Sequence, residues 1–345
     1  MRLALITVLS IAGGGILAAT GLPLGWLLGA ALVTGAVAIT GYAVAVPVGL
    51  QRAGIVMLGV GSGLAVTPGV GGLLLSWLPV MLLTLALSVG LAVALSGLFA
   101  RRAGTDRATA FFSLLPGGII EMASIGERHQ ANRAVITALH TTRTGLIVLG
   151  LPVLATLLDR TTTDAAASLV SAAPTLPPLA TLLVLAIGTV GGMLAALLRL
   201  PACWLVGPIV LVSVLSLGGW MAVGQLPEVV IIIAQLLVGM TLGARFKRRM
   251  LLQVPRALLV GLPLQLLMGG VVVGCALALA LMTQASPVTL LLASAGGGVA
   301  EMVLAAKVLD EQVELIVGFH IVRLVLVNLG AGWLWTVLQQ RARRR

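Results

Sequence analysis

Three long stretches without a single charged side chain constrain this sequence more than any other feature. Residues 3–51, 53–100 and 257–300 lack Asp, Glu, Lys and Arg over 49, 48 and 44 residues. A membrane-spanning helix needs about 20 predominantly apolar residues, so each stretch is long enough for two. With 59% hydrophobic and 9% charged residues, the chain is too apolar for a soluble domain and too poor in charge for disorder. The sequence therefore predicts an all-α polytopic membrane protein.

Short motifs recur in one order at nearly constant spacing, which indicates an internal duplication. The residues that match at an offset of 180 are Glu121 with Glu301, His140 with His320, and Arg143 with Arg323. At an offset of 178, LPLGWLLG at 22–29 matches LPACWLVG at 200–207. We therefore divide the chain into two membrane repeats, residues 1–165 and residues 166–345.

Each repeat contains six hydrophobic segments, and the basic loops between them differ. The segments lie near 3–20, 22–49, 54–67, 71–100, 108–126 and 133–158, and near 177–198, 201–222, 229–244, 252–283, 287–306 and 313–338. In the first repeat, Arg101, Arg102 and Arg107 follow the fourth segment, whereas in the second repeat the cluster Arg245–Arg249 follows the third. Because basic loops stay on the cytoplasmic side, the two repeats are predicted to have inverted topology.

Inverted repeats require an odd number of crossings each, so one of the six segments cannot span the membrane. The fifth segments are short and are interrupted by PGG at 116–118 and by GGG at 296–298. We therefore expect each repeat to have five transmembrane helices plus one re-entrant helical hairpin, with both termini cytoplasmic. Only Arg160 and Lys307 among the loop and terminal basic residues then lie outside. Twelve full spans would place Arg245–Arg249 outside, which the positive-inside rule disfavours.

Two glutamates are the acidic candidates for a functional site. Of the ten acidic residues, only Glu121 and Glu301 lie deep in apolar segments. An ionisable group at membrane depth costs about 2.5–3.5 kcal/mol on insertion scales, so it indicates function by default. In the functional interpretation, the glutamates carry protons or sodium ions. In the structural alternative, each lies in the first turn of the half-helix after the glycine break, where a carboxylate satisfies free N–H groups and the helix dipole.

Two His-x-x-Arg motifs supply the basic candidates. Arg143 and Arg323 are the basic residues that lie deep in apolar segments, and each follows a histidine, His140 or His320, by three residues on one helix face. In the functional interpretation, the arginines neutralise an anionic solute, and the histidines tune or relay protons. In the structural alternative, each arginine pairs with a glutamate and holds the fold together.

Glycine pairs at the two breaks complete the set of candidate site residues. Gly117 and Gly118, like Gly297 and Gly298, allow a tight hairpin tip or a close approach of the backbone to a ligand. Broken helices that meet near the midplane of inverted repeats form the substrate sites of secondary transporters. The sequence therefore predicts a site for a small anionic or zwitterionic solute and for H⁺ or Na⁺, with no cofactor and no metal.

These motifs resemble those of a known family. GGIIEM at 117–122 and GGVAEM at 297–302, each followed by its His-x-x-Arg motif, resemble the bacterial AbrB-type membrane protein family over nearly the whole chain. The resemblance implies an internally duplicated, multi-pass protein of the bacterial inner (cytoplasmic) membrane. The family's names also imply a role in regulating gene expression and, under another label, ammonia monooxygenase activity.

The residues do not support the enzymatic label. A copper or iron oxygenase needs clustered histidine or carboxylate ligands, but His129 lies in a polar loop, and His140 and His320 lie in different repeats. No hydrophilic stretch is long enough to form a DNA-binding module. We therefore expect no enzyme and no direct nucleic-acid partner.

Three functions remain in order of preference. The first is an ion-coupled secondary transporter in the lipid bilayer, and the sequence is compatible with a homo-oligomer. The second is a membrane-embedded regulator that affects gene expression indirectly, without transport, through a partner at the basic cytoplasmic loops. The third is a membrane oxygenase.

Overall fold

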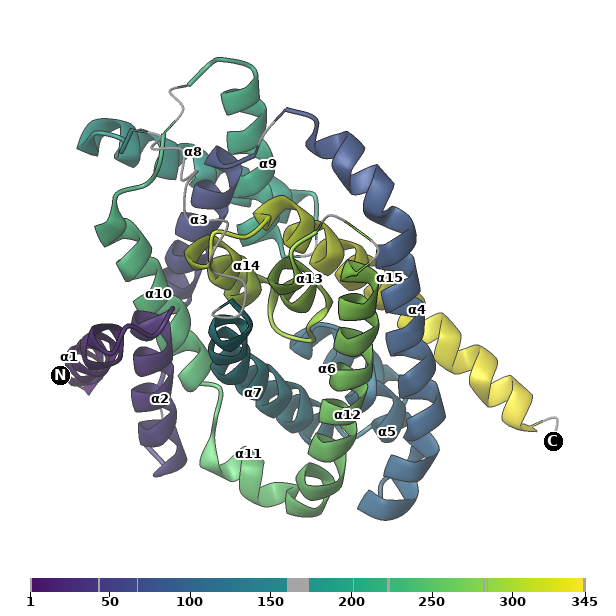
Figure 1. Ribbon diagram of the computed structural model, residues 1–345. Helices are drawn as coiled ribbons and strands as arrows, with labels where there is room; N and C mark the ends of the chain where they lie inside the picture. Colours follow the sequence, from purple (N-terminus) through teal and green to yellow (C-terminus); the bar gives the residue numbers. More distant parts are fainter. Residues whose placement is uncertain are drawn as a thin grey trace. The chain divides into compact units, whose positions relative to one another are not determined.

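The computed structural model of this chain is built from α-helices, labelled α1 to α15 (Figure 1). It describes residues 2–42, 44–66, 68–159, 174–200, 202–221, 224–281, 283 and 285–343. The predicted repeat boundary between residues 165 and 166 lies outside these residues, as does Arg160.

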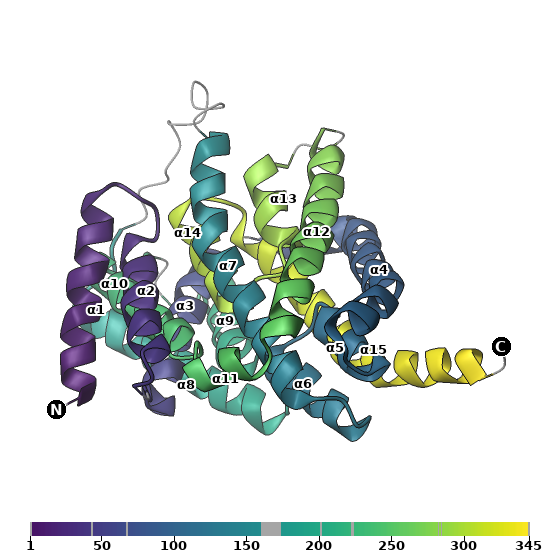
Figure 2. The same ribbon diagram turned by 90° about the horizontal axis from the view of Figure 1, so that it is seen from below.

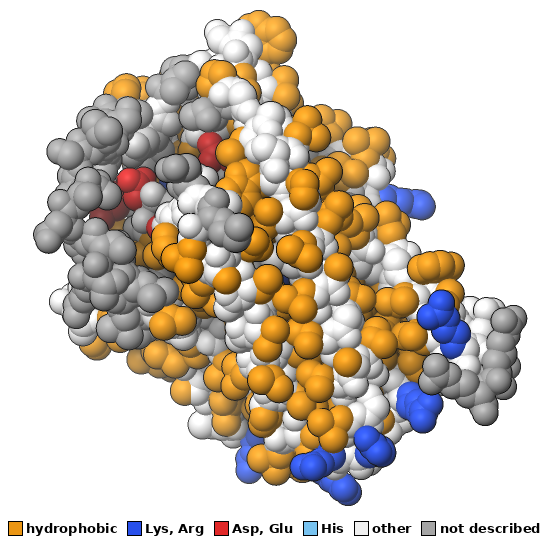
Figure 3. All heavy atoms as spheres, turned by 45° about the vertical axis from the view of Figure 1, so that its right-hand side comes forward, with side chains coloured by type: hydrophobic (Ala, Val, Ile, Leu, Met, Phe, Trp, Pro, Cys, Tyr) orange, Lys and Arg blue, Asp and Glu red, His pale blue; other side chains and the backbone are white. Residues whose placement is uncertain are grey.

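Six helical stretches of the described residues are long and apolar enough to cross a membrane. They are Val70–Ala103, Arg133–Leu151, Pro178–Leu197, Glu228–Gln253, Pro255–Ala280 and Val313–Arg341. Shorter apolar helices accompany them. In Figure 3, hydrophobic side chains dominate the visible surface, and Lys and Arg side chains lie at its margins. Since large apolar side chains such as Leu75 and Leu329 are exposed on these helices, the chain requires a lipid bilayer as its solvent.

The described residues pack into two compact units, each of which takes segments from both halves of the sequence. Unit 1 comprises Met1–Leu75, Leu149–Arg245 and Ala300–Leu315, and unit 2 comprises Ser76–Val148, Phe246–Val299 and Ile316–Arg345. Packing therefore groups the chain differently from a division into consecutive halves.

Unit 1 is built from pairs of closely packed helices. Its helices are α1 (Arg2–Ala19), α2 (Gly25–Ile39), α3 (Val48–Leu64), α8 (Pro178–Leu197), α9 (Cys203–Leu217), α10 (Glu228–Gly243) and most of α14 (Val299–Val308). Helix α1 packs on α2, α8 packs on α9, and α10 packs on α2 and α3 (Figure 1).

Glycines permit the close approach of these helix pairs. Gly29 of α2 faces the backbone of Gly13 of α1, and Gly207 of α9 faces the backbone of Gly191 of α8. A Cβ atom at Gly29 or Gly207 would collide with that backbone. The absence of a side chain therefore lets the helices approach closely, as small residues do at helix interfaces in membranes.

Unit 2 combines long helices with several helices of ten residues or fewer (Figure 2). Its helices are α4 (Val70–Ala103), α5 (Arg107–Leu114), α6 (Ile119–Arg128), α7 (Arg133–Asp159), α11 (Arg248–Gln253), α12 (Pro255–Ala280), α13 (Pro287–Ser294) and α15 (Val313–Arg343), of which α4, α7 and α15 extend beyond the unit at one end. Phe111 and Phe112 of α5 are fully buried, and their rings lie 5.4 and 6.0 Å from that of Trp335. This aromatic cluster fixes α5 in the core of the unit.

Both fifth segments are interrupted where the sequence predicts. Helices α5 and α6 have 8 and 10 residues and are separated by residues 115–118. Helices α13 and α14 also have 8 and 10 residues and are separated by residues 295–298. At about 1.5 Å per residue, none of the four reaches across a hydrocarbon core of about 30 Å.

The largest difference from the sequence analysis lies at the segments predicted near 22–49 and 54–67, where α2 ends at Ile39 and α3 already begins at Val48. The predicted segment 252–283 begins later, because Arg248–Gln253 forms the separate helix α11 and Pro255 begins α12. Proline fits the first turn of a helix and breaks its interior, which explains the separation.

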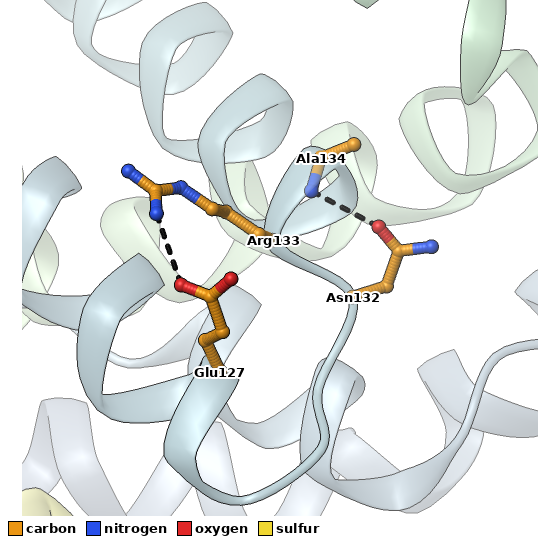
Figure 4. A network of polar contacts seen from close by, with 4 residues as sticks. All are labelled: Glu127, Asn132, Arg133 and Ala134. Carbon is orange, nitrogen blue, oxygen red and sulfur yellow. Dashed lines mark hydrogen bonds and ion pairs between the residues drawn. The ribbon is translucent and has the colours of Figure 1, made fainter.

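A polar turn joins the first broken segment to α7 (Figure 4). Asn132 Oδ1 accepts hydrogen bonds from the backbone N–H groups of Ala134 (3.0 Å) and Val135 (3.3 Å), so Asn132 caps α7. Arg133 Nη1 lies 2.9 Å from Glu127 Oε2 in an exposed ion pair. The cap and the ion pair fix the entry of α7, the helix that carries His140 and Arg143.

Candidate functional site

Both deep arginines line one small cavity, and that cavity belongs entirely to unit 2. Its volume is about 40 Å³. Its walls are formed by Ser88, Leu114, Pro116, Arg143, Ile147, Gln265, Met268, Gly269, Val272, Ser294, Gly296 and Arg323. Helix α7 supplies Arg143, α15 supplies Arg323, and the break between α13 and α14 supplies Gly296. The structure thus brings together two residues that stand 180 positions apart in the sequence.

His140 holds Arg143 by a hydrogen bond whose direction is fixed by its neighbours. His140 Nε2 lies 2.9 Å from the carbonyl oxygen of Phe112, and His140 Nδ1 lies 3.3 Å from Arg143 Nη2. A carbonyl only accepts hydrogen bonds and a guanidinium only donates them. His140 is therefore neutral, donates through Nε2 and accepts through Nδ1.

The same arrangement recurs at His320 and Arg323, and this arginine makes additional hydrogen bonds. His320 Nε2 donates to the carbonyl of Leu292 at 3.1 Å, and Arg323 Nη2 donates to His320 Nδ1 at 2.8 Å. Arg323 also donates to the carbonyls of Ala295 at 2.6 Å and Gly297 at 3.2 Å. The backbone of the second break therefore immobilises this guanidinium.

The described residues provide no carboxylate partner within 4.0 Å of either arginine in the cavity. The ion pairs found among the described residues are Arg133–Glu127 and Arg245–Glu301, which involve other arginines. Arg143 is 8% exposed, and its buried Nε finds no hydrogen-bond partner in the described part of the chain. Because two like charges lining one cavity repel each other, and because a buried charge without a counter-ion is costly, this arrangement favours an anion.

Neither glutamate is among the described residues that line the cavity, and the two glutamates differ from each other. Glu121 is partly exposed in the first turn of α6. Glu301 is 5% exposed in the first turn of α14, with Oε1 4.0 Å from Arg245 Nη1. Both residues lie in the first turn of a helix, which is where the structural alternative places them. The alternative in which Arg143 and Arg323 pair with the glutamates is not found among the described residues.

None of the four predicted glycines is among the described residues that line the cavity. A Cβ at Gly117 would collide with Met122, and one at Gly118 would collide with the carboxylate of Glu121. Gly297 accepts the hydrogen bond from Arg323, and Gly298 directly precedes α14. Compact turns thus explain these glycines, while the glycine that lines the cavity is the preceding one, Gly296.

Sequence reasoning missed the polar wall formed by Ser88, Gln265 and Ser294. Gln265 Nε2 donates to the carbonyl of Ser113 at 2.8 Å, and its Oε1 is buried without a partner. One signal was present, because Gln265 is an isolated amide in the apolar helix α12. The serines gave no signal, since their hydroxyls bond to carbonyls of their own helices, as serines in helices commonly do.

Comparison with known proteins places this geometry in a family. Residues 26–339 match the family model described as "Transition state regulatory protein AbrB". The chain is also 30% identical over 341 residues to the "Uncharacterized protein YhjN" of Bacillus subtilis (strain 168), covering 92% of this chain and 88% of the relative. The cavity, the two His-x-x-Arg motifs and both broken segments all lie within the matched region. This multi-pass membrane protein belongs to the AbrB family.

Proposed function

We propose that this protein is a secondary transporter of a small anionic or zwitterionic solute, driven by a proton or sodium gradient. The observation that carries the proposal is the pair Arg143 and Arg323, which line one cavity without a carboxylate partner among the described residues. Charge at membrane depth is retained where a substrate or ion uses it. The proposal assigns the protein no enzymatic step.

We further propose that the two halves of the chain are inverted repeats in the bacterial inner membrane, with both termini cytoplasmic. Rare left-handed backbone conformations support the duplication because they recur at the offsets of the sequence motifs. Leu24 (φ 61°) and Ala202 (φ 50°) precede α2 and α9, and Gln130 (φ 62°) and Asp310 (φ 54°) follow α6 and α14. Non-glycine residues seldom adopt this conformation, so its recurrence supports a common origin. The inverted orientation rests on the distribution of basic loops.

Glu301 is the better candidate for carrying the coupling ion. Its carboxylate is buried, and its separation of 4.0 Å from Arg245 is at the limit of an ion pair, so a proton or sodium ion can compete with the arginine. Glu121 is partly exposed and has no ion-pair partner among the described residues. The histidines act by positioning the guanidinium groups, since their hydrogen bonds require the neutral form.

Flux measurements on the full-length chain in proteoliposomes test this function. A panel of small labelled anions and amino acids is offered under an imposed pH or sodium gradient. We expect uptake by the wild type and loss of uptake in Arg143→Gln and Arg323→Gln. Glu301→Gln is expected to abolish gradient-driven uptake but to retain solute exchange, with Glu121→Gln as its matched control. Absence of flux for the whole panel, or normal flux in both arginine variants, would refute the proposal.

A second candidate is a membrane-embedded regulator that acts without transport. It is favoured by the description of the family as a regulatory protein and by the exposed side chains of Lys247, Arg248 and Arg249. This function predicts a stable partner that is lost from pull-downs when these three residues are changed to Gln. It also predicts that neutralising Arg143 and Arg323 leaves the partner bound.

A further inference from the structure

The charges around the cavity distinguish between an anionic and a zwitterionic solute. We propose that Arg143 and Arg323 bind a compact oxyanion or short carboxylate that carries no ammonium group. This inference rests on the proposed transport function, which allows anionic and zwitterionic solutes, and it selects the anionic class. It is carried by the composition of the walls, the free donors on the arginines and the volume of the cavity.

The composition of the walls disfavours an ammonium group. Two guanidinium groups line the cavity, and no Asp or Glu lines it among the residues that the structure describes. An amino acid bound through its carboxylate would place its ammonium group in the same small space as two positive charges. Gln265 offers only a neutral amide oxygen, which does not compensate for this repulsion.

The free donors on the arginines fit the oxygens of a small anion. A guanidinium has five N–H donors in a planar fork that matches carboxylates and oxyanions. Within the described residues, Arg323 uses three of them on His320, Ala295 and Gly297, whereas Arg143 uses one, on His140. Arg323 therefore acts as a fixed positive charge, and Arg143 keeps most of its donors for the ligand.

The volume of the cavity, which is partly open, favours a small ligand. The 40 Å³ is the space open to the centres of water-sized molecules. One water requires about 10–15 Å³ of such space, so the cavity holds about three waters. Acetate, nitrate and sulfate are of this size, whereas succinate and citrate exceed it. Ile147, Met268 and Val272 form apolar walls that can contact a short methyl or methylene group.

Binding to the purified full-length protein tests the inference independently of transport. Isothermal titration in detergent compares acetate with glycine, which differ by the ammonium group, and compares acetate, nitrate and sulfate with succinate and citrate. We expect saturable binding of at least one of the three compact anions. We expect glycine to bind at least tenfold more weakly than acetate, and citrate to show no binding.

Three variants and one control locate the binding site in the cavity. Arg143→Gln and Arg323→Gln are expected to abolish binding of acetate, whereas Arg101→Gln, at an exposed arginine, preserves it. Gly296→Ala places a methyl group 3.5 Å from Ile147 Cδ1 and 3.6 Å from Arg143 Nε, which are ordinary contact distances. Because the methyl takes space from the cavity, we expect it to weaken sulfate binding more than formate binding.

The outcomes separate this inference from the transport proposal. Equal affinity for glycine and acetate, tighter binding of succinate or citrate, normal binding in both arginine variants, or no binding of any compact anion overturns the inference. If larger or zwitterionic solutes are nevertheless transported in an arginine-dependent manner, the proposed transport function stands. Only the restriction to compact anions without an ammonium group then fails. If acetate binds at the arginines but no solute is transported, the site stands and the transport function fails.

Discussion

Arg323 donates a hydrogen bond of 2.8 Å to Nδ1 of His320, one turn earlier on α15, and the imidazole thereby fixes the direction of the guanidinium. On α7 the corresponding bond is 3.3 Å long. Each neutral histidine thus accepts a hydrogen bond from a positively charged arginine, and the bond on α15 is the shorter of the two.

Because Arg323 has two further hydrogen bonds to backbone carbonyls, removing the two histidines should have unequal effects. His140→Ala removes the hydrogen bond that orients Arg143, and a hydrogen bond to a charged group contributes about 1.5–3 kcal/mol. We therefore expect the affinity for acetate to fall about tenfold or more. His320→Ala should reduce it less, because Arg323 retains the carbonyls of Ala295 and Gly297. Titration of both variants measures the effect, and an equal or larger loss in His320→Ala would contradict this interpretation.

Removing a charge from the cavity should stabilise the ligand-free protein while it abolishes binding. Arg143 is buried without a carboxylate partner among the described residues, so Arg143→Gln relieves an unfavourable charge burial. A gain of about 1 kcal/mol corresponds to about 2–4 °C in Tm for a domain of 150–250 residues. Thermal unfolding in detergent checks this.

The control for this measurement is Arg133→Gln, which removes an exposed ion pair with Glu127 and should change Tm little. A lower Tm in Arg143→Gln than in Arg133→Gln would show that Arg143 supports the fold rather than a ligand.

Close helix packing in unit 1 predicts two sensitive glycines. Gly29→Ala and Gly207→Ala each force a methyl group into the backbone of a neighbouring helix, so both should lower the thermal stability strongly. Gly49→Ala on α3 is the matched control, because its Cβ would have open space around it. We expect Gly49→Ala to be neutral or slightly stabilising, since alanine favours the helix. Equal stability of the three variants would argue against this packing.

The proposed inverted topology predicts the labelling of single cysteines. In a background with Cys203→Ser and Cys275→Ser, Arg102→Cys and Arg248→Cys should resist an impermeant maleimide applied from the periplasmic side. Glu228→Cys should react, because residue 228 is exposed and is predicted to lie outside. Labelling of only one of the two arginine positions from that side would place them on opposite faces and refute the inverted repeats.

Sequence reasoning recovered the features of the fold that are local. The apolar stretches predicted most of the helices, and PGG at 116–118 and GGG at 296–298 located the breaks. The bounds predicted for the segments 22–49 and 54–67 were wrong, because α2 ends at Ile39 and α3 begins at Val48. Pro255 shows where the reasoning stopped, because a proline that begins a helix and one that kinks it look alike within an apolar run. Interleaving of both halves in two units is a consequence of tertiary packing, which no local pattern encodes.

For the site, the residue types were predictable and their grouping was not. Arg143 and Arg323 were found because charge at membrane depth is rare. Symmetry of the motifs suggested equivalent glutamates, yet Glu301 is buried beside Arg245 and Glu121 is partly exposed. Since Arg245, which lies beside Glu301, comes from a segment distant in sequence, equal motifs do not ensure equal surroundings.

The walls of the cavity all come from unit 2. In the proposed transporter, recognition of the anion therefore depends on this unit alone, and mutations in unit 1 are expected to alter the rate of transport without changing which solute is bound. Selectivity and turnover of the proposed transporter would then respond to substitutions in different parts of the chain.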